Sequence, residues 1–334
     1  TLFRSHKNYF SCYTFNMYSL QDLKTHLQEK HNLKINPNQE KDLRKIGYYH
    51  GYKGYRFVRK SNNPISFTNF SQVVALNDFD MQLKGLFYPN LMFIENALKN
   101  YVLEATLADS QSENLQEVFN KSLTYYKEFK TGTAAYKKEF KRKMDLQMKI
   151  NSALIRDYMS GKEIETHFYE NGREVPVWAA FESLSLGEFG TFFACSNKTI
   201  RLEVSELLKL PTNLNADGFL LKDIIFVLKD LRNAIAHNGI IFDTRFATSE
   251  AGKNIKTLLE NELKIKQIDF NFIISYVALV CYILKQLDES KRIKSFVNEY
   301  QKIQKMTERL PVSQNLIFGT QDKSIAEKLH SLCK

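Results

Sequence analysis

The sequence predicts an all-α protein built around one helical core. Only 13 glycines and 6 prolines occur in 334 residues, which is few for the many turns that β-sandwiches, barrels and propellers require. Apolar residues instead recur every three or four positions through long segments, as they do along one face of a helix. With 43% hydrophobic and 13% aromatic residues the chain can form a substantial core, so extensive disorder is excluded.

The N-terminal region begins with two short helices. The residues SLQD from Ser19 have capping-box spacing and predict a helix that ends near Lys30. Pro37 suits the first turn of a second helix, which should end before Gly47. The following segment, IGYYHGYKGY at residues 46–55, holds three glycines and four tyrosines and predicts an irregular but packed loop.

Longer helices follow. From Thr68 to about Leu107 apolar residues return at helical spacing, and Pro89 is expected to interrupt or restart that helix. Residues 115–129 and 134–159 predict two further helices, both strongly charged. The sequence therefore places its longest helical region directly after the tyrosine-rich segment.

The C-terminal half continues the helical pattern. Asp217 can cap a helix whose apolar stripe runs from Leu220 to Ile235 and which should stop at Asn238-Gly239. The longest apolar stretch, FNFIISYVALVCYIL at residues 270–284, has 15 residues, which is short for a membrane span of about 20 and predicts a buried helix. Other helices are expected at residues 200–208, at 290–306 and near Ser324.

We expect three regions along the chain: an N-terminal extension (1–66), a helical domain (67–306) and a C-terminal appendage (307–334). No internal repeat or low-complexity tract is present. The start of the chain lacks an apolar signal core, and Thr1 in first place suggests that the natural N-terminus is missing.

The cysteines and glycines limit the kinds of chemistry. The four cysteines are scattered and have no zinc-finger spacing: Cys12, Cys195, Cys281 and Cys333. They predict reduced thiols in a cytoplasmic protein and no metal site. Neither GxGxxG nor GxxxxGK[ST] occurs, so nothing supports a nucleotide-dependent enzyme, and we expect no cofactor and no membrane partner.

The net charge of +10 is concentrated in two segments. Residues 121–150 carry nine Lys/Arg and three acids, and residues 41–60 carry seven bases and one acid, so each has a net charge of +6. Basic residues among aromatic rings suit nucleic acid, whereas the alternatives are a solvated helix face and a core aromatic cluster. The candidate RNA-binding residues are Lys137, Lys138, Lys141, Arg142, Lys143, Lys53, Arg56 and Arg59.

One short segment suits cleavage of RNA. In LRNAIAHNG, Arg232 precedes His237 by five residues and Asn233 follows the arginine. Cleavage without metal uses the 2′-OH of the substrate as nucleophile, so the enzyme has only to move protons and stabilise charge on the phosphate. Histidine, with an ordinary pKa of about 6.5, suits the first task and the rigid arginine fork the second. Asn233 would orient either side chain.

The spacing does not by itself identify a site, since Arg44 and His50 stand at a similar distance. Positions five apart differ by about 140° on an ideal helix, so Arg232 and His237 do not share one face. Either His237 lies in the last turn, where its direction is freer, or two copies of the segment meet in a symmetric dimer. The alternative is structural: Arg232 pairs with an acid and His237 ends the helix, where the dipole favours a cation.

The segment LRNAIAHNG resembles the Arg-x4-His signature of HEPN ribonuclease domains, and the chain as a whole resembles the AbiD/AbiF group of bacterial abortive-infection proteins. Matching pieces occur in the family's order between about residues 19 and 287: IGYYHGYKGY (46–55), FTNFSQVVALNDFDMQLKGL (67–86), FIENALKNYV (93–102) and PVWAAFESLSLGEFG (176–190). The chain departs from the family pattern where that pattern has arginine, at His50, Lys99 and Ile240, and where it has asparagine, at Asp243.

This resemblance implies an all-helical HEPN-like bundle, phage defence, and RNA cleavage through Arg232 and His237. It also implies a small non-coding RNA as a partner in some members. Asp80 and Glu95 match acidic positions of the family, and we expect them to be buried partners of basic residues. The alternative is a direct catalytic role.

Two hypotheses follow from the sequence. The first is a metal-independent endoribonuclease toxin of a phage-defence system, acting as a homodimer and bound or restrained by a non-coding RNA. The second is a non-catalytic RNA-binding protein that forms a ribonucleoprotein with a small RNA. A protein-only interaction scaffold is a third alternative, which RNA co-purification would separate from both.

Overall fold

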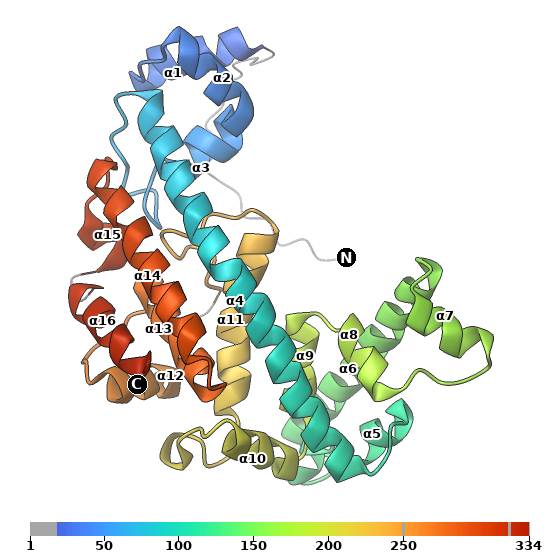
Figure 1. The fold of residues 1–334 in the computed structure, drawn as a ribbon. Helices are drawn as coiled ribbons and strands as arrows, with labels where there is room; N and C mark the ends of the chain where they lie inside the picture. The colour runs from blue at the N-terminus through green and yellow to red at the C-terminus, as the bar shows by residue number, and fades with distance from the viewer. Residues whose placement is uncertain (1–18, 249–250, 320–321, 334) are drawn as a thin grey trace. The chain divides into compact units, whose positions relative to one another are not determined.

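The structure is a computed structural model that describes residues 19–248, 251–319 and 322–333 (Figure 1). Within these residues all regular secondary structure is helical, and the extended chain forms only isolated bridges such as Asn114–Pro176. The predicted all-α class is therefore confirmed. The chain divides into two compact units, which contain the described residues 19–78 with 309–311, and 79–308 with 312–333.

In the first unit, α1 (Leu20–His31) and α2 (Pro37–Ile46) begin where the sequence predicts. The Ser19 hydroxyl accepts a hydrogen bond from the backbone N–H of Asp22, and the Asp22 carboxylate accepts one from the backbone N–H of Ser19. This reciprocal pair is the predicted capping box, and it satisfies two N–H groups that a helix start leaves unpaired.

The prediction of an irregular loop at residues 46–55 is wrong, because a π-helical turn (Gly47–Tyr52) and α3 (Lys53–Tyr55) form there. The helical winding places Tyr48 and Tyr52 on one face, with their rings stacked at 6.1 Å and both buried. A Cβ atom at Gly51 would lie 2.6 Å from the Ile46 side chain, so only glycine lets this wide turn close. The predicted packing is confirmed for Tyr48, Tyr52 and Tyr55, whereas Tyr49 is 67% exposed.

Helix α4 (Phe70–Ser110) is continuous through Pro89, so the expected interruption there is wrong. Proline removes one backbone hydrogen bond and crowds the carbonyl four residues earlier. That carbonyl belongs to Gly85, and the turns on both sides are anchored by the buried side chains of Phe87 and Leu91. Tertiary packing therefore keeps the helix intact across the proline.

The second unit contains the rest of α4, from Phe79 on, and the helices that follow it. The prediction of a single helix at residues 115–129 is wrong, because α5 ends at Lys121 and a 3₁₀ turn (Tyr125–Glu128) follows it. The segment between them turns inward, where Ser122 and Leu123 are fully buried and the Ser122 hydroxyl donates to Asp109. The helices are α5 (Leu115–Lys121), α6 (Ala134–Met159), α7 (Glu163–Glu170), α8 (Val177–Ser183), α9 (Leu186–Cys195), α10 (Lys198–Leu207), α11 (Leu220–Ala236), α12 (Lys253–Leu263), α13 (Ile273–Gln286), α14 (Ser290–Met306), α15 (Gln314–Phe318) and α16 (Asp322–Leu329).

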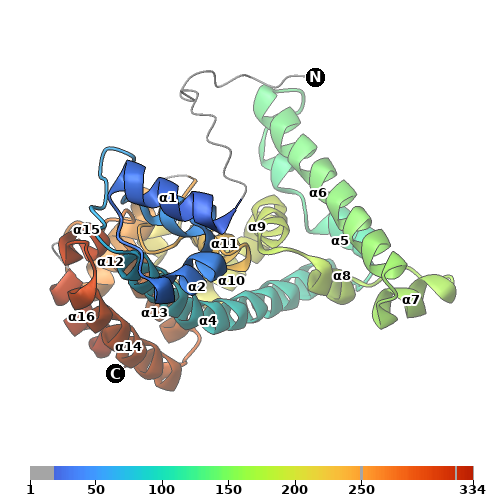
Figure 2. The same ribbon diagram turned by 90° about the horizontal axis from the view of Figure 1, so that it is seen from above.

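Within this unit α9 packs against both α6 and α11 and lies between them (Figure 2). Gly190 makes the contact with α11 possible, because a Cβ atom there would lie 2.9 Å from the Ile225 side chain. The apolar segment predicted to be a buried helix is α13, whose residues are buried almost throughout, so that prediction is confirmed. None of the helices in the described ranges combines the length and apolar character needed to cross a membrane.

The described C-terminal residues also pack into the second unit. Ile317, Phe318 and Leu329 are buried, and the Phe318 ring meets the rings of Phe79 and Tyr300 edge to face at 6.1 and 6.0 Å. These contacts tie α15 to α4 and α14, so the last segment contributes side chains to the core.

Candidate functional site

The predicted catalytic residues lie at the C-terminal end of α11. Six apolar side chains bury one face of this helix: Leu220, Leu221, Ile224, Ile225, Leu228 and Leu231. Asp217 does not cap the helix as expected; Phe219 is the first flanking residue, and the Asp217 carboxylate accepts its backbone N–H. The predicted stop is confirmed, since Asn238 adopts a left-handed backbone conformation (φ 53°) directly after His237.

Arg232 is held beside an acid from α4. Its Nε atom lies 3.3 Å from Oε2 of Glu95, and the two side chains are 25% and 10% exposed. Both atoms are enclosed, and neither makes a hydrogen bond of good geometry within the described residues, so the contact is an ion pair. Nη1 of Arg232 donates a 3.3 Å hydrogen bond to the side-chain oxygen of Asn233. These contacts orient the guanidinium and leave N–H donors for a ligand.

Glu95 is shared between two cations. Its Oε1 atom lies 3.3 Å from Nζ of Lys99, one turn along α4, and the same amine donates to the backbone carbonyl of Leu184 at 2.7 Å. The carboxylate is thus placed between Lys99 and Arg232. This confirms the expectation that Glu95 is a largely buried partner of basic residues.

His237 occupies the C-cap of α11, and its backbone N–H donates to the carbonyl of Asn233 at 3.0 Å. Its ring is exposed and makes no hydrogen bond or ion pair with any residue that the structure describes. The structural alternative is thus also observed, because Arg232 pairs with an acid and His237 ends the helix. Neither the ion pair of Arg232 nor the C-cap position of His237 covers the imidazole, so this structural role is compatible with proton transfer by His237.

A second buried acid anchors the chain that follows His237. Asp80 is fully buried, and one of its oxygens accepts the backbone N–H groups of Ile241 and Phe242 at 2.9 and 2.8 Å. Nζ of Lys84 lies 2.9 Å from the other oxygen and donates to the side chain of Asn238 at 2.9 Å. The expected burial of Asp80 beside a base is confirmed, and its partner stands four residues away, where a helix brings the two side chains together.

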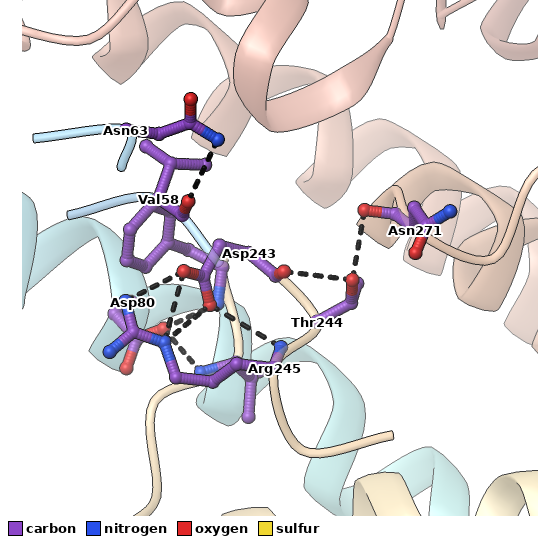
Figure 3. A network of polar contacts seen from close by, with 9 residues as sticks. Val58, Asn63, Asp80, Asp243, Thr244, Arg245 and Asn271 are labelled. Carbon is purple, nitrogen blue, oxygen red and sulfur yellow. Dashed lines mark hydrogen bonds and ion pairs between the residues drawn. The ribbon is translucent and has the colours of Figure 1, made fainter. Parts of the chain in front are cut away.

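Further contacts hold this segment at residues 243–245 (Figure 3). The Arg245 guanidinium folds back on the fully buried Asp243 carboxylate, with Nη2 to Oδ2 at 2.6 Å, and the Thr244 hydroxyl donates to the carbonyl of Asn271 at 2.8 Å. The chain on the C-terminal side of His237 is therefore rigidly held, whereas the His237 ring is not.

The candidate RNA-binding residues of α6 fall into two groups. Lys137, Lys138 and Lys141 are exposed. Arg142 forms an ion pair with the buried Glu139, and Lys143 is itself buried, with its amine 5.2 Å from the ring centre of Tyr126. Burial, reinforced by the nearby charge of Lys127, lowers the pKa of Lys143. Three of the five side chains thus present free charge to solvent.

The other three candidates lie in the first unit. Nζ of Lys53 is 5.2 and 5.0 Å from the ring centres of Tyr48 and Tyr49, and the guanidinium of Arg56 is 5.9 Å from that of Phe57. Arg59 adopts a positive φ of 59°. Lys53 and Arg56 stand over aromatic rings, so the two sequence alternatives, a basic surface and a tyrosine cluster, coexist there.

Two cysteines of the second unit are poorly placed for nucleophilic catalysis. Cys195 and Cys281 are both buried. Burial raises the pKa of the Cys195 thiol to about 12, which keeps it protonated at neutral pH.

A scan against protein-family models matches residues 41–243 to the family described as Abi-like protein. The match covers more than half of the chain and includes both buried acids, Arg232 and His237. A search of curated proteins and a search of solved structures each returned no match.

Proposed function

This chain belongs to the Abi-like protein family, whose role is abortive infection in phage defence, and we propose that it acts there as a metal-independent endoribonuclease toxin with a HEPN-type site. Arg232 binds and stabilises the scissile phosphate, His237 transfers protons, and Asn233 orients the arginine. The protein works in the bacterial cytoplasm as a homodimer.

In the proposed reaction the 2′-OH of one ribose attacks the adjacent phosphorus and the bond from phosphorus to the 5′-oxygen breaks. A base takes the proton of the 2′-OH and an acid returns one to the leaving 5′-oxygen, so the products are a 2′,3′-cyclic phosphate and a 5′-OH end. The ordinary pKa of histidine suits either step near neutral pH. Negative charge that builds up on the phosphate is met by the guanidinium of Arg232.

The observation that carries this proposal is the difference between the two side chains at the end of α11. Arg232 is fixed through Nε by Glu95 and through Nη1 by Asn233, while the exposed His237 ring makes no hydrogen bond or ion pair with the described residues. A preorganised cation beside a free imidazole is what phosphate binding combined with proton transfer requires.

The homodimer follows from the position of the two groups on one helix. Arg232 lies within α11, and His237, five residues later, is its C-cap. On an ideal helix, two positions five residues apart point in directions that differ by about 140°. Two copies of the segment facing each other would supply one imidazole as base and one as acid. We infer that the active form is symmetric and that each copy contributes Arg232 and His237.

The test is to prepare Arg232→Ala and His237→Ala separately and to measure cleavage of RNA and toxicity in cells. Each change should lower the cleavage rate by at least about 100-fold, and the wild-type products should carry cyclic phosphate ends. Arg156→Ala and His167→Ala are matched controls, because Arg156 also pairs with an acid and His167 is also exposed. Full cleavage and full toxicity in both site variants would refute the assignment.

A second candidate function is non-catalytic binding of a small RNA. It is favoured by Lys137, Lys138 and Lys141, which are exposed and form no ion pair with an acid among the described residues. RNA recovered with the purified protein, steep salt dependence of binding and no cleavage at high protein concentration would support it. Both functions hold together if the bound RNA restrains the nuclease.

A further inference from the structure

A cluster of three aromatic rings lies where the 3₁₀ turn Tyr125–Glu128 meets the first turns of α6. The Tyr126 ring is 5.4 Å from that of Tyr136 and 4.9 Å from that of Phe140, between ring centres. Tyr136 and Phe140 are four residues apart on α6, so they share a face, and their planes are within 18° of parallel at 6.1 Å. We call these three residues the aromatic platform.

The platform is open to solvent. Phe140 is 37% exposed, which is unusual for a phenylalanine that has two aromatic neighbours, and both tyrosines are partly exposed. Burying these rings in the core would be favourable, since each aromatic side chain contributes a large apolar area. Their partial exposure leaves them accessible to a ligand with flat faces.

The surroundings of the platform are strongly positive. Five exposed lysines belong to the 3₁₀ turn, to α6 or to the loop between them: Lys127, Lys130, Lys137, Lys138 and Lys141. The two acids nearby are already neutralised, because Glu128 pairs with Arg201 and Glu139 with Arg142. The ammonium groups are therefore not cancelled by these carboxylates, and they are available to an anionic ligand.

We propose that the aromatic platform and its lysines bind single-stranded RNA, with bases stacked on Tyr136 and Phe140, Tyr126 packed against these two rings, and phosphates held by the lysines. Stacking on aromatic rings along a basic groove is how proteins bind single strands without reading sequence. A duplex hides its base faces, so it would use the lysines alone. This inference rests on the proposed action on RNA and names its substrate class as unpaired RNA.

Binding is measured with fluorescently labelled 2′-O-methyl-oligouridine of about 12 nucleotides, a length that spans a site of this kind. Because this RNA has no free 2′-OH, the proposed reaction cannot cleave it, and the wild-type protein can be used. We expect Phe140→Ala to weaken binding about 10-fold. Replacing Lys137, Lys138 and Lys141 together by glutamine should reduce the slope of log K against log salt by about 2.

The matched controls lie on the same helix. Met148→Ala removes an apolar side chain that is 62% exposed, and Lys149→Gln removes an exposed charge outside the platform. Both should bind the oligonucleotide as the wild type does. Equal weakening by Phe140→Ala and Met148→Ala would overturn the proposal, as would wild-type affinity in the Phe140 variant.

Two further measurements separate RNA from other ligands and do not depend on a variant. Photocrosslinking of 5-iodouridine in the oligonucleotide to the wild-type protein should give adducts at the platform residues, and adducts confined to other peptides would overturn the proposal. Polyglutamate of matched charge should compete poorly. Equal competition by polyglutamate would show that the surface binds polyanions without using the rings. Equal loss of duplex binding in Phe140→Ala would show that the variant does not act through stacking of unpaired bases. Either result would overturn the proposal.

The outcomes for the platform and for the nuclease are distinct. Platform-dependent binding without any cleavage of natural RNA leaves the platform standing and refutes the nuclease. Cleavage that depends on Arg232 and His237 but not on Phe140, with normal binding by Phe140→Ala, refutes the platform alone.

Discussion

Oε2 of Glu95 on α4 lies 3.3 Å from Nε of Arg232 on α11, and this ion pair joins two helices that are far apart in the sequence. The carboxylate also faces Lys99, so it balances two cations with one negative charge. The arrangement leaves net positive charge at the end of α11, where the proposed phosphate binds.

Glu95 should act as a positioning residue for Arg232. Glu95→Gln keeps the shape but removes the charge, so we expect a lower kcat for RNA cleavage by about 10-fold, with KM little changed, because the guanidinium loses its fixed direction. Stability should fall by about 1–2 kcal/mol, less than for a fully buried pair, since Arg232 is 25% exposed. Glu117→Gln, which breaks an exposed pair with Lys121, is the control. A kcat equal to that of the wild type would contradict this role.

Asp80 and Lys84 should be coupled in stability. Asp80→Ala leaves a buried ammonium and two backbone N–H groups without their acceptor, so we expect a loss of about 3–5 kcal/mol in the free energy of unfolding. In the double variant Asp80→Ala, Lys84→Met the loss should be smaller than the sum of the losses in Asp80→Ala and Lys84→Met alone. Denaturant titration measures all four proteins. Additive losses would mean that the two side chains act independently. As a control, Asp145→Ala, at an exposed site, should change the free energy of unfolding little.

Acidification should destabilise the first unit. Burial, with the charges of nearby cations, lowers the pKa of His26 and His31, so the unfolded chain takes up protons before the folded one does. Stability is then fully present above the ordinary histidine pKa of about 6.5 and is lost as the pH falls below it.

Thermal unfolding at pH 7.5 and 5.5 checks this expectation. The wild type should lose more stability between the two values than the variant His26→Gln, His31→Gln, which cannot take up those protons. His167→Gln, which changes an exposed histidine of the second unit, should behave as the wild type. Identical pH dependence in the wild type and the double variant would show that these two histidines are not responsible.

Cys195 should be protected from alkylation. Because burial raises the pKa of its thiol to about 12, the reactive thiolate is scarce at pH 8. Iodoacetamide should label the Cys195 peptide slowly in the folded protein and rapidly in denaturant, as measured by mass spectrometry. Labelling of the folded protein at the denatured rate would contradict the buried position.

Local signals in the sequence were sufficient for much of the fold. The capping box at Ser19, the proline at the start of α2 and the stop at Asn238 all act within a few residues, so the sequence predicts them and the structure confirms them. The Arg232–His237 spacing was likewise visible, although spacing alone did not distinguish it from chance.

Contacts between distant segments were decided only by the tertiary structure. Packing on both sides of Pro89 keeps α4 continuous, burial of the tyrosines winds residues 47–55 into helix, and Lys143 is buried within a segment that reads as a charged surface. The partners Glu95 for Arg232 and Lys84 for Asn238 come from α4, more than a hundred positions away in the chain. Local periodicity determines which face of a helix is apolar, but the choice of partner depends on which helices meet, and that is settled only when the whole core packs.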